Sequence, residues 1–171
     1  MPVGRAIICG SAALAAVSGG LVGSLAAASP APSAMPPLAW QNAGKLQILC
    51  TVVSDRFGER ESLEAQLCAR TRALAAKNSP VAVQPLAFGD PALIDPANIT
   101  LLLHASVQQP GAERLLVFNI RAYRAGGVET DILFGAVPRA VTLSDAEAFA
   151  PALDAALSAA LSETLPWHGA R

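Results

Sequence analysis

The sequence has 171 residues, with 12 Lys and Arg against 13 Asp and Glu, so its formal net charge is −1. This balance, together with the absence of a basic stripe, argues against a nucleic-acid-binding protein. The sequence also has no metal-ligand spacing, no phosphate-binding glycine loop and no paired-carboxylate signature, so it predicts no metal site and no cofactor.

The N-terminus is apolar. Arg5 is the only charge before Lys45, and a run of Ala, Leu, Val, Ile, Gly and Ser from Ala6 to Ala28 follows it. This pattern, which ends in small residues, predicts a secretory signal peptide over residues 1–28. The alternative is an uncleaved membrane anchor, because the run is long enough to span a bilayer. We expect a secreted or periplasmic protein, associated with a membrane only if the segment stays uncleaved.

The rest of the chain reads as one domain behind a linker. Residues 29–44 are rich in Pro, Ala and Ser, which predicts a flexible linker whose Trp40 can pack on the edge of the domain. Residues 45–166 are enough for a single α+β domain with its own core. Pro166 ends the last predicted helix, and residues 167–171 are expected to be a frayed tail.

The first half of the predicted domain contains a strand, a helix and a second strand. Residues 45–53 alternate apolar and polar side chains, which predicts a strand. Leucines at helical spacing predict a helix over about residues 59–77. A short strand at 81–83 follows, and residues 89–98 form a loop with one helical turn.

Residues 99–137 predict three consecutive antiparallel strands, because each segment alternates with period two. A four-residue turn between the first two strands places Leu103 opposite Leu116. A three-residue loop between the last two places Arg121 opposite Asp131. Both registers put apolar side chains opposite one another on one face.

The last predicted helix follows this sheet. Ser144-Asp145-Ala146-Glu147 matches a capping box, and leucines at fourfold spacing come after it. Pro151 predicts either a kink or a helix that begins only there. The element order is therefore β-α-β-β-β-β-α. It predicts a two-layer α+β sandwich, with a mostly antiparallel sheet of about five strands and two helices on one face. In element order alone, it resembles small accessory modules of the Gram-negative envelope, such as the amino-terminal domain of the Tol-system propeller protein.

Two cysteines remain after removal of residues 1–28. Cys50 lies on the apolar face of the first predicted strand and Cys68 on the helix that follows. Because disulfides persist outside the cytoplasm, the pair predicts a strand-to-helix disulfide. Two buried free thiols are the alternative.

The outer face of the predicted sheet mixes aliphatic and polar side chains, whereas a solvated face usually carries fewer aliphatics. Either another part of this chain, such as the Leu38–Trp40 stretch of the linker, or another protein therefore covers this face. For the second case the sequence predicts an interaction face composed of Leu102, His104, Val117, Asn119, Arg121, Tyr123, Asp131 and Leu133.

We expect an exported envelope accessory or interaction module without catalytic activity, whose partner is an envelope protein or a second copy. It binds through this face or through the strand edge near Val81. A small-molecule or lipid carrier with a cavity between helices and sheet is the alternative. A hydrolase that uses His104 with Ser106 ranks third, since a flat sheet supplies neither a nucleophile elbow nor an oxyanion hole.

Overall fold

The computed structural model describes residues 40–126 and 135–169. The predicted signal peptide, most of the predicted linker and the site residues Asp131 and Leu133 lie outside these ranges. Among the described residues, none of the helices has the length and apolar character needed to cross a membrane.

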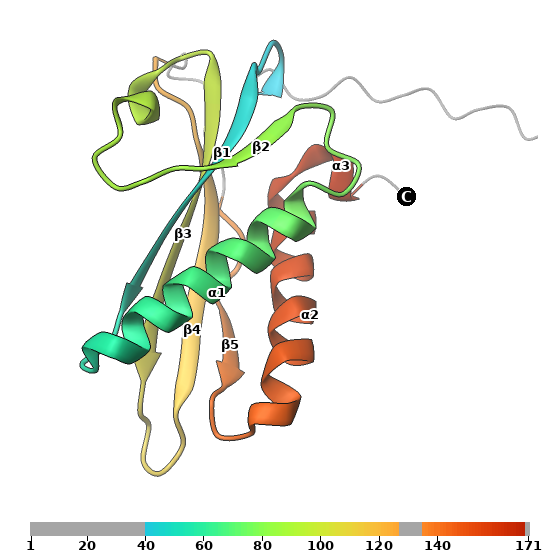
Figure 1. Cartoon of the computed structure of the whole chain (residues 1–171). Helices are drawn as coiled ribbons and strands as arrows, with labels where there is room; N and C mark the ends of the chain where they lie inside the picture. The colour runs from blue at the N-terminus through green and yellow to red at the C-terminus, as the bar shows by residue number, and fades with distance from the viewer. Residues whose placement is uncertain (1–39, 127–134, 170–171) are drawn as a thin grey trace, which may run out of the picture. The chain divides into compact units, whose positions relative to one another are not determined.

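The described chain folds as an α+β domain with two main helices (Figure 1). Its elements are, in order, β1 (Lys45–Val53), α1 (Phe57–Ala75), β2 (Ala82–Pro85), the short 3-10 helix η2 (Pro91–Ile94), β3 (Asn98–Gln108), β4 (Leu115–Tyr123), β5 (Arg139–Thr142), α2 (Ala146–Thr164) and α3 (Pro166–Gly169). The predicted first strand and first helix are present, and the predicted turn in residues 89–98 is η2.

The sheet is mixed, so the prediction of a mostly antiparallel sheet is wrong. The strand order is β2-β1-β3-β4-β5, in which β1 runs parallel to both β2 and β3 while β4 is antiparallel to β3 and β5. The segment between β2 and β3 is long enough to bring the chain back on the other side of β1, as a parallel neighbour requires. β1 therefore lies between two parallel neighbours, and every residue from Leu46 to Cys50 is buried.

The β3–β4 hairpin has the predicted faces in a different register. Leu103 lies opposite Ile120 rather than Leu116, because the connection covers residues 109–114 instead of a four-residue turn. The shift is four residues. Since side chains alternate with period two, an even shift leaves every side chain on its predicted face.

The strand after β4 also differs from the prediction. Arg121 pairs with Gly135 rather than Asp131, and the named strand β5 lies at residues 139–142, where the sequence analysis predicts none. A Cβ at Gly135 would lie 3.2 Å from the Cβ of Arg121, so this close approach suits glycine. Farther along, Ala136 and Val141 are both buried. They are five residues apart, so in a regular strand their side chains would point to opposite faces. The chain between them therefore contains one extra residue, as in a β-bulge.

The core lies between the helices and one face of the sheet. On that face, β1, β3 and β4 contribute alternate side chains from Leu46, Ile99 and Leu116 onward. The helices contribute the buried residues Leu63, Leu67, Ala75, Leu153, Leu157, Ala160 and Leu161. Both helices therefore bury their apolar stripes in one shared cluster.

The ends of the last helices differ from the sequence analysis. Asp145 rather than Ser144 caps α2, because its carboxylate accepts hydrogen bonds from Glu147 N and Ala148 N, both at 3.0 Å. Pro151 lies inside α2, five residues after its start. It leaves one carbonyl without its usual donor, but Pro151 is exposed and water can take that place.

Residues 166–169 form one helical turn where the sequence predicts a frayed tail. Trp167 accounts for the difference. Its ring stacks edge-to-face on Trp40 with centroids 5.2 Å apart, and its Nε1 donates to the carbonyl of Ala75 over 3.4 Å. The end of the predicted linker thus packs against the C-terminal end of the domain, as expected for Trp40.

Candidate functional site

The candidate site is the outer face of the sheet, the side opposite the core. Strand pairing arranges its residues in rows that cross the sheet. One row is Thr51, His104 and Asn119, and a neighbouring row is Val53, Ser106, Val117 and Ala140. A third row is Leu49, Leu102, Arg121 and Gly135.

His104 lies exposed in the middle of this face, directly opposite Asn119. The predicted register places it opposite Leu115 instead, and the four-residue shift of the hairpin accounts for the difference. Its Nδ1 is 3.1 Å from the hydroxyl of Thr51 on β1. The hydroxyl of Ser106 accepts a hydrogen bond from the side chain of Gln108 over 3.0 Å. His104 is therefore bonded to Thr51, and Ser106 to Gln108. The hydrogen bonds of the described residues do not join His104 to Ser106, the two residues of the suggested hydrolase site.

The row through Val117 is accessible, and apart from Ser106 it is apolar. The side chain of Val53 is 58% exposed, Ala140 is exposed and Val117 is half-buried. On the same face, Leu102 is half-buried and Tyr123 is 37% exposed. This is more accessible apolar surface than a fully solvated sheet face usually carries.

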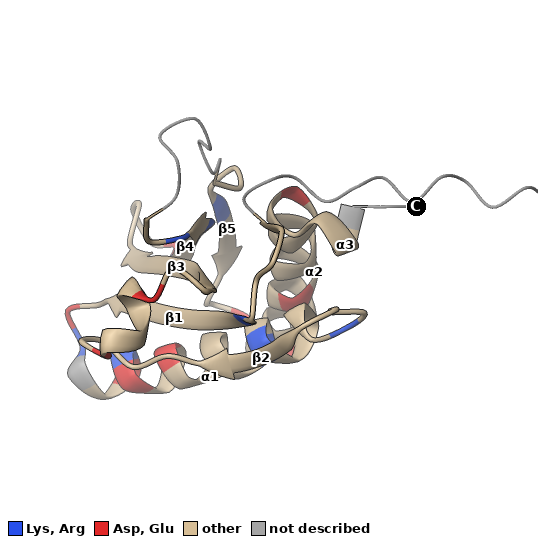
Figure 2. Cartoon of the chain, turned by 90° about the horizontal axis from the view of Figure 1, so that it is seen from above, with Lys and Arg blue, Asp and Glu red and all other residues tan. Residues whose placement is uncertain are grey.

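Charged residues are scarce on the strands that form this face. β3 has none, and β4 has only Arg121, which is exposed. Figure 2 shows the contrast, since most of the blue and red segments lie on the helices and connections. A face with few charges is easier to desolvate than a charged one, which favours burial against another protein.

At one end of the outer face, the side chains are buried and joined by polar contacts that the sequence analysis did not identify. Thr100 and Gln47 are nearly fully buried, and the Thr100 hydroxyl donates to Gln47 Oε1 over 3.2 Å. Beside them, the Arg124 guanidinium donates to the carbonyls of Pro96, at 2.8 Å, and Gln41, at 2.9 Å. These bonds join three connections that are distant in sequence, which local patterns cannot reveal.

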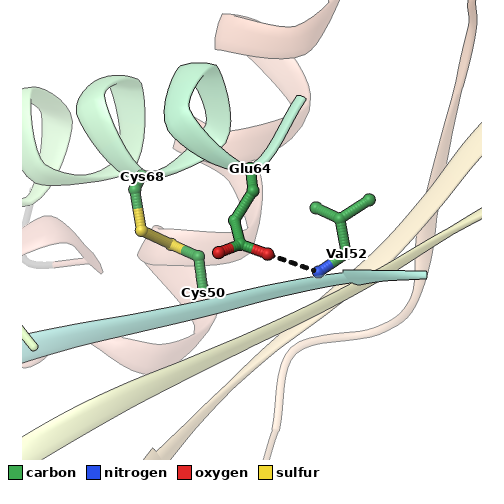
Figure 3. The surroundings of a disulfide bond; sticks show 4 residues. All are labelled: Cys50, Val52, Glu64 and Cys68. Atoms are coloured by element: carbon green, nitrogen blue, oxygen red, sulfur yellow. Dashed lines mark hydrogen bonds between the residues drawn. A yellow bond between two sulfur atoms is a disulfide. The ribbon is translucent and has the colours of Figure 1, made fainter. Parts of the chain in front are cut away.

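Cys50 and Cys68 lie at disulfide-bonding distance, with sulfur atoms 2.02 Å apart and Cα atoms 5.8 Å apart. The pair joins β1 to α1, as the sequence predicts, and lies next to Glu64 (Figure 3). A Glu64 carboxylate oxygen accepts a hydrogen bond from Val52 N over 3.3 Å. The two contacts fix α1 against one side of β1.

An ion pair fixes the N-terminal end of α1. Glu59 accepts a hydrogen bond from Arg114 over 2.7 Å and another from the Ser54 hydroxyl over 3.2 Å. The bond from Arg114 is the main reason that the pKa of the Glu59 carboxyl lies below its ordinary value of 4.5, although partial burial acts in the other direction. The start of α1 is thereby joined to the β3–β4 connection.

Of the eight predicted interaction residues, the structure places six on the outer face. They are Leu102, His104, Val117, Asn119, Arg121 and Tyr123. Asp131 and Leu133 lie outside the described residues. Val53 and Ala140 belong to the same surface but were not predicted, because the sequence analysis did not place β1 or β5 beside these rows. Among the described residues, no group of three or more His, Cys, Asp and Glu side chains is arranged to hold a metal ion.

No protein-family model and no curated protein sequence matches the chain. Among solved structures, it is similar to two crystal forms of the PelC dodecamer from Paraburkholderia phytofirmans. A single-substitution variant in space group C2 has a TM-score of 0.43 at 12% identity, covering 72% of this chain and 89% of that chain. The P6 form has a TM-score of 0.38 at 12% identity, covering 76% and 89%. Similarity at these values carries no inference about this chain.

Proposed function

We propose that this chain is an exported accessory or interaction module of the cell envelope, located in the periplasm and without catalytic activity. Its outer sheet face binds an envelope protein or a second copy of the chain. The domain is a two-layer sandwich in which both helices cover the opposite face, leaving the outer face for the partner.

The row through Val117 carries this proposal. It places exposed and half-exposed apolar side chains across neighbouring strands, beside a strand that has no charged residue. Apolar surface of this kind is stabilised when a partner removes it from water. The Ser106 hydroxyl accepts its hydrogen bond from Gln108 and is not bonded to His104, which supports a binding role over a hydrolytic one.

The location of the protein has its own test. The intact mass of the exported protein should correspond to a chain that begins after Ala28. A mass that retains Met1 would contradict cleavage and favour the membrane anchor. The disulfide is consistent with an oxidising compartment.

Replacing Val117 by Glu tests the interaction face. The variant should lose partner binding while keeping its melting temperature, because a charge would have to be desolvated at the centre of the interface. Ala155→Glu, on an exposed position of α2, adds the same charge elsewhere and should bind normally.

Binding is measured by in vivo cross-linking and affinity purification of the tagged protein, and self-association by analytical ultracentrifugation. A reproducible envelope protein or a dimer that the Val117→Glu variant loses would support the face. Unchanged assembly of that variant would refute it. Loss of phenotype in His104→Ala at normal stability and with normal partner binding would instead favour an enzyme.

A further inference from the structure

The open half of β1, residues 49–53, has a strand neighbour on one side only among the described residues. β1 pairs with β3 along its whole length but with β2 only as far as Ile48. β2 ends at Pro85, and the last backbone bond on this side runs from Leu86 N to Ile48 O over 2.9 Å. Beyond that bond, the described chain provides no further strand.

An open groove of about 600 Å³ follows this part of β1. The first turns of α1 form one wall, and the chain after β2 forms the other. The second wall ends at Phe88, whose side chain is 85% exposed. The floor includes Cys50 and Val52. In a strand, the backbone N–H and C=O groups of every second residue point to the same edge. Ile48 points to the β2 side, because its carbonyl accepts a hydrogen bond from Leu86 N. Cys50 and Val52 therefore present their N–H and C=O groups toward the groove.

Glu64 occupies the position where a strand carbonyl would bind. Its carboxylate extends from α1 to the N–H of Val52, beside the disulfide (Figure 3). The N···O distance of 3.3 Å is longer than the usual range for such a bond. An incoming strand carbonyl would take the place of this carboxylate at the N–H of Val52, and the released carboxylate would then face the new strand.

The charges of the groove favour a basic occupant. Its lining includes Glu61 and Glu64 against the single basic residue Arg60, a net charge of −1. A Lys or Arg side chain would pair with these carboxylates, and its stem would lie on the exposed ring of Phe88.

We propose that this groove binds an extended segment of a partner protein, which adds to the open half of β1 as a strand and places a basic side chain beside Glu61 and Glu64. This site uses the edge of the sheet, and it is independent of the outer face that contains Val117. One chain can therefore hold two partners, or one partner at two places.

The probe is a fluorescein-labelled, acetylated and amidated hexapeptide of alternating Val and Lys, titrated with the oxidised exported protein and followed by fluorescence anisotropy. We expect saturable binding, about tenfold weaker binding of the peptide in which Glu replaces Lys, and no binding when its edge-facing amides are N-methylated. The amide NMR signals of Cys50 and Val52 should shift on titration. Absence of saturable binding, or equal binding of the acidic or N-methylated peptide, would overturn the proposal.

Variants locate the site. Phe88→Ser removes an exposed side chain, and Glu64→Lys reverses a charge in the groove; both should weaken binding by about tenfold or more. Glu147→Lys makes the same charge change on an exposed position of α2 and should leave binding unchanged. Val117→Glu should also bind the peptide normally, which separates this site from the outer face. Unchanged binding by both groove variants would show that the peptide binds elsewhere.

Discussion

Breaking the bond between Cys50 and Cys68 should destabilise the domain by about 3 kcal/mol, from the chain-entropy cost of the loop it closes. The two residues are 18 positions apart, and the bond restricts the unfolded chain between them. Because Cys50 is only 5% exposed, replacing it would also alter core packing. Reduction of the natural sequence is therefore the cleaner perturbation.

The assay is urea unfolding followed by tryptophan fluorescence, since both Trp40 and Trp167 lie at the packed edge of the domain. Reductant should lower the unfolding free energy of the natural protein. It should have no effect on the double variant Cys50→Ala, Cys68→Ala, which controls for other effects of the reductant. An unchanged free energy of unfolding on reduction, or two free thiols under denaturing, non-reducing conditions, would refute the reasoning.

Three further predictions concern contacts between elements. The folded-state pKa of Glu59 is below its ordinary value, so the stability that its carboxylate contributes is complete above about pH 4.5 and is lost as the pH falls through the folded pKa. Glu59→Gln should therefore reduce the free energy of unfolding at neutral pH but not at low pH. An equal loss at every pH in urea titrations would contradict this. Arg70 donates two hydrogen bonds of 2.8 Å to the carboxylate of Asp154 and so joins α1 to α2. A double-mutant cycle that replaces each of the two residues by Ala should give a coupling energy of about 0.5–1 kcal/mol. Additive effects of the two single substitutions would show that no coupling exists. Trp167→Ala should cost about 2 kcal/mol in thermal or urea unfolding, because it removes a half-buried ring and the contact of that ring with Trp40. No change would show that the C-terminal turn does not contribute to stability.

The faces of the strands could be predicted because they depend on side-chain alternation, which is local. The pairing partners could not, because they depend on how many residues each connection uses. In the β3–β4 hairpin, both registers bury Leu103 and differ only in its partner, Leu116 or Ile120. The apolar pattern is the same in both, so only the longer connection distinguishes them.

The candidate site was predictable to the same extent. The alternation identified the outer-face residues of β3 and β4, including His104 and Val117. It could not add Val53 or Ala140, because their place beside these rows depends on β1 pairing with β3 and β5 pairing with β4. The groove at the open half of β1 also depends on where pairing with β2 stops, and no local pattern records that.

The sequence by itself determined which faces of β1, β3 and β4 point into the core, where β1 and α1 lie and that Cys50 and Cys68 can meet. Period-two and helical patterns and the positions of these two cysteines are properties of short segments. Only the tertiary structure decided that β1 lies between β2 and β3 in a mixed sheet. That choice depends on the long connection between β2 and β3, whose route brings β3 to the far side of β1. Contacts between distant segments, such as those of Arg124 and Trp167, follow from this route, and they exist only once the chain has folded.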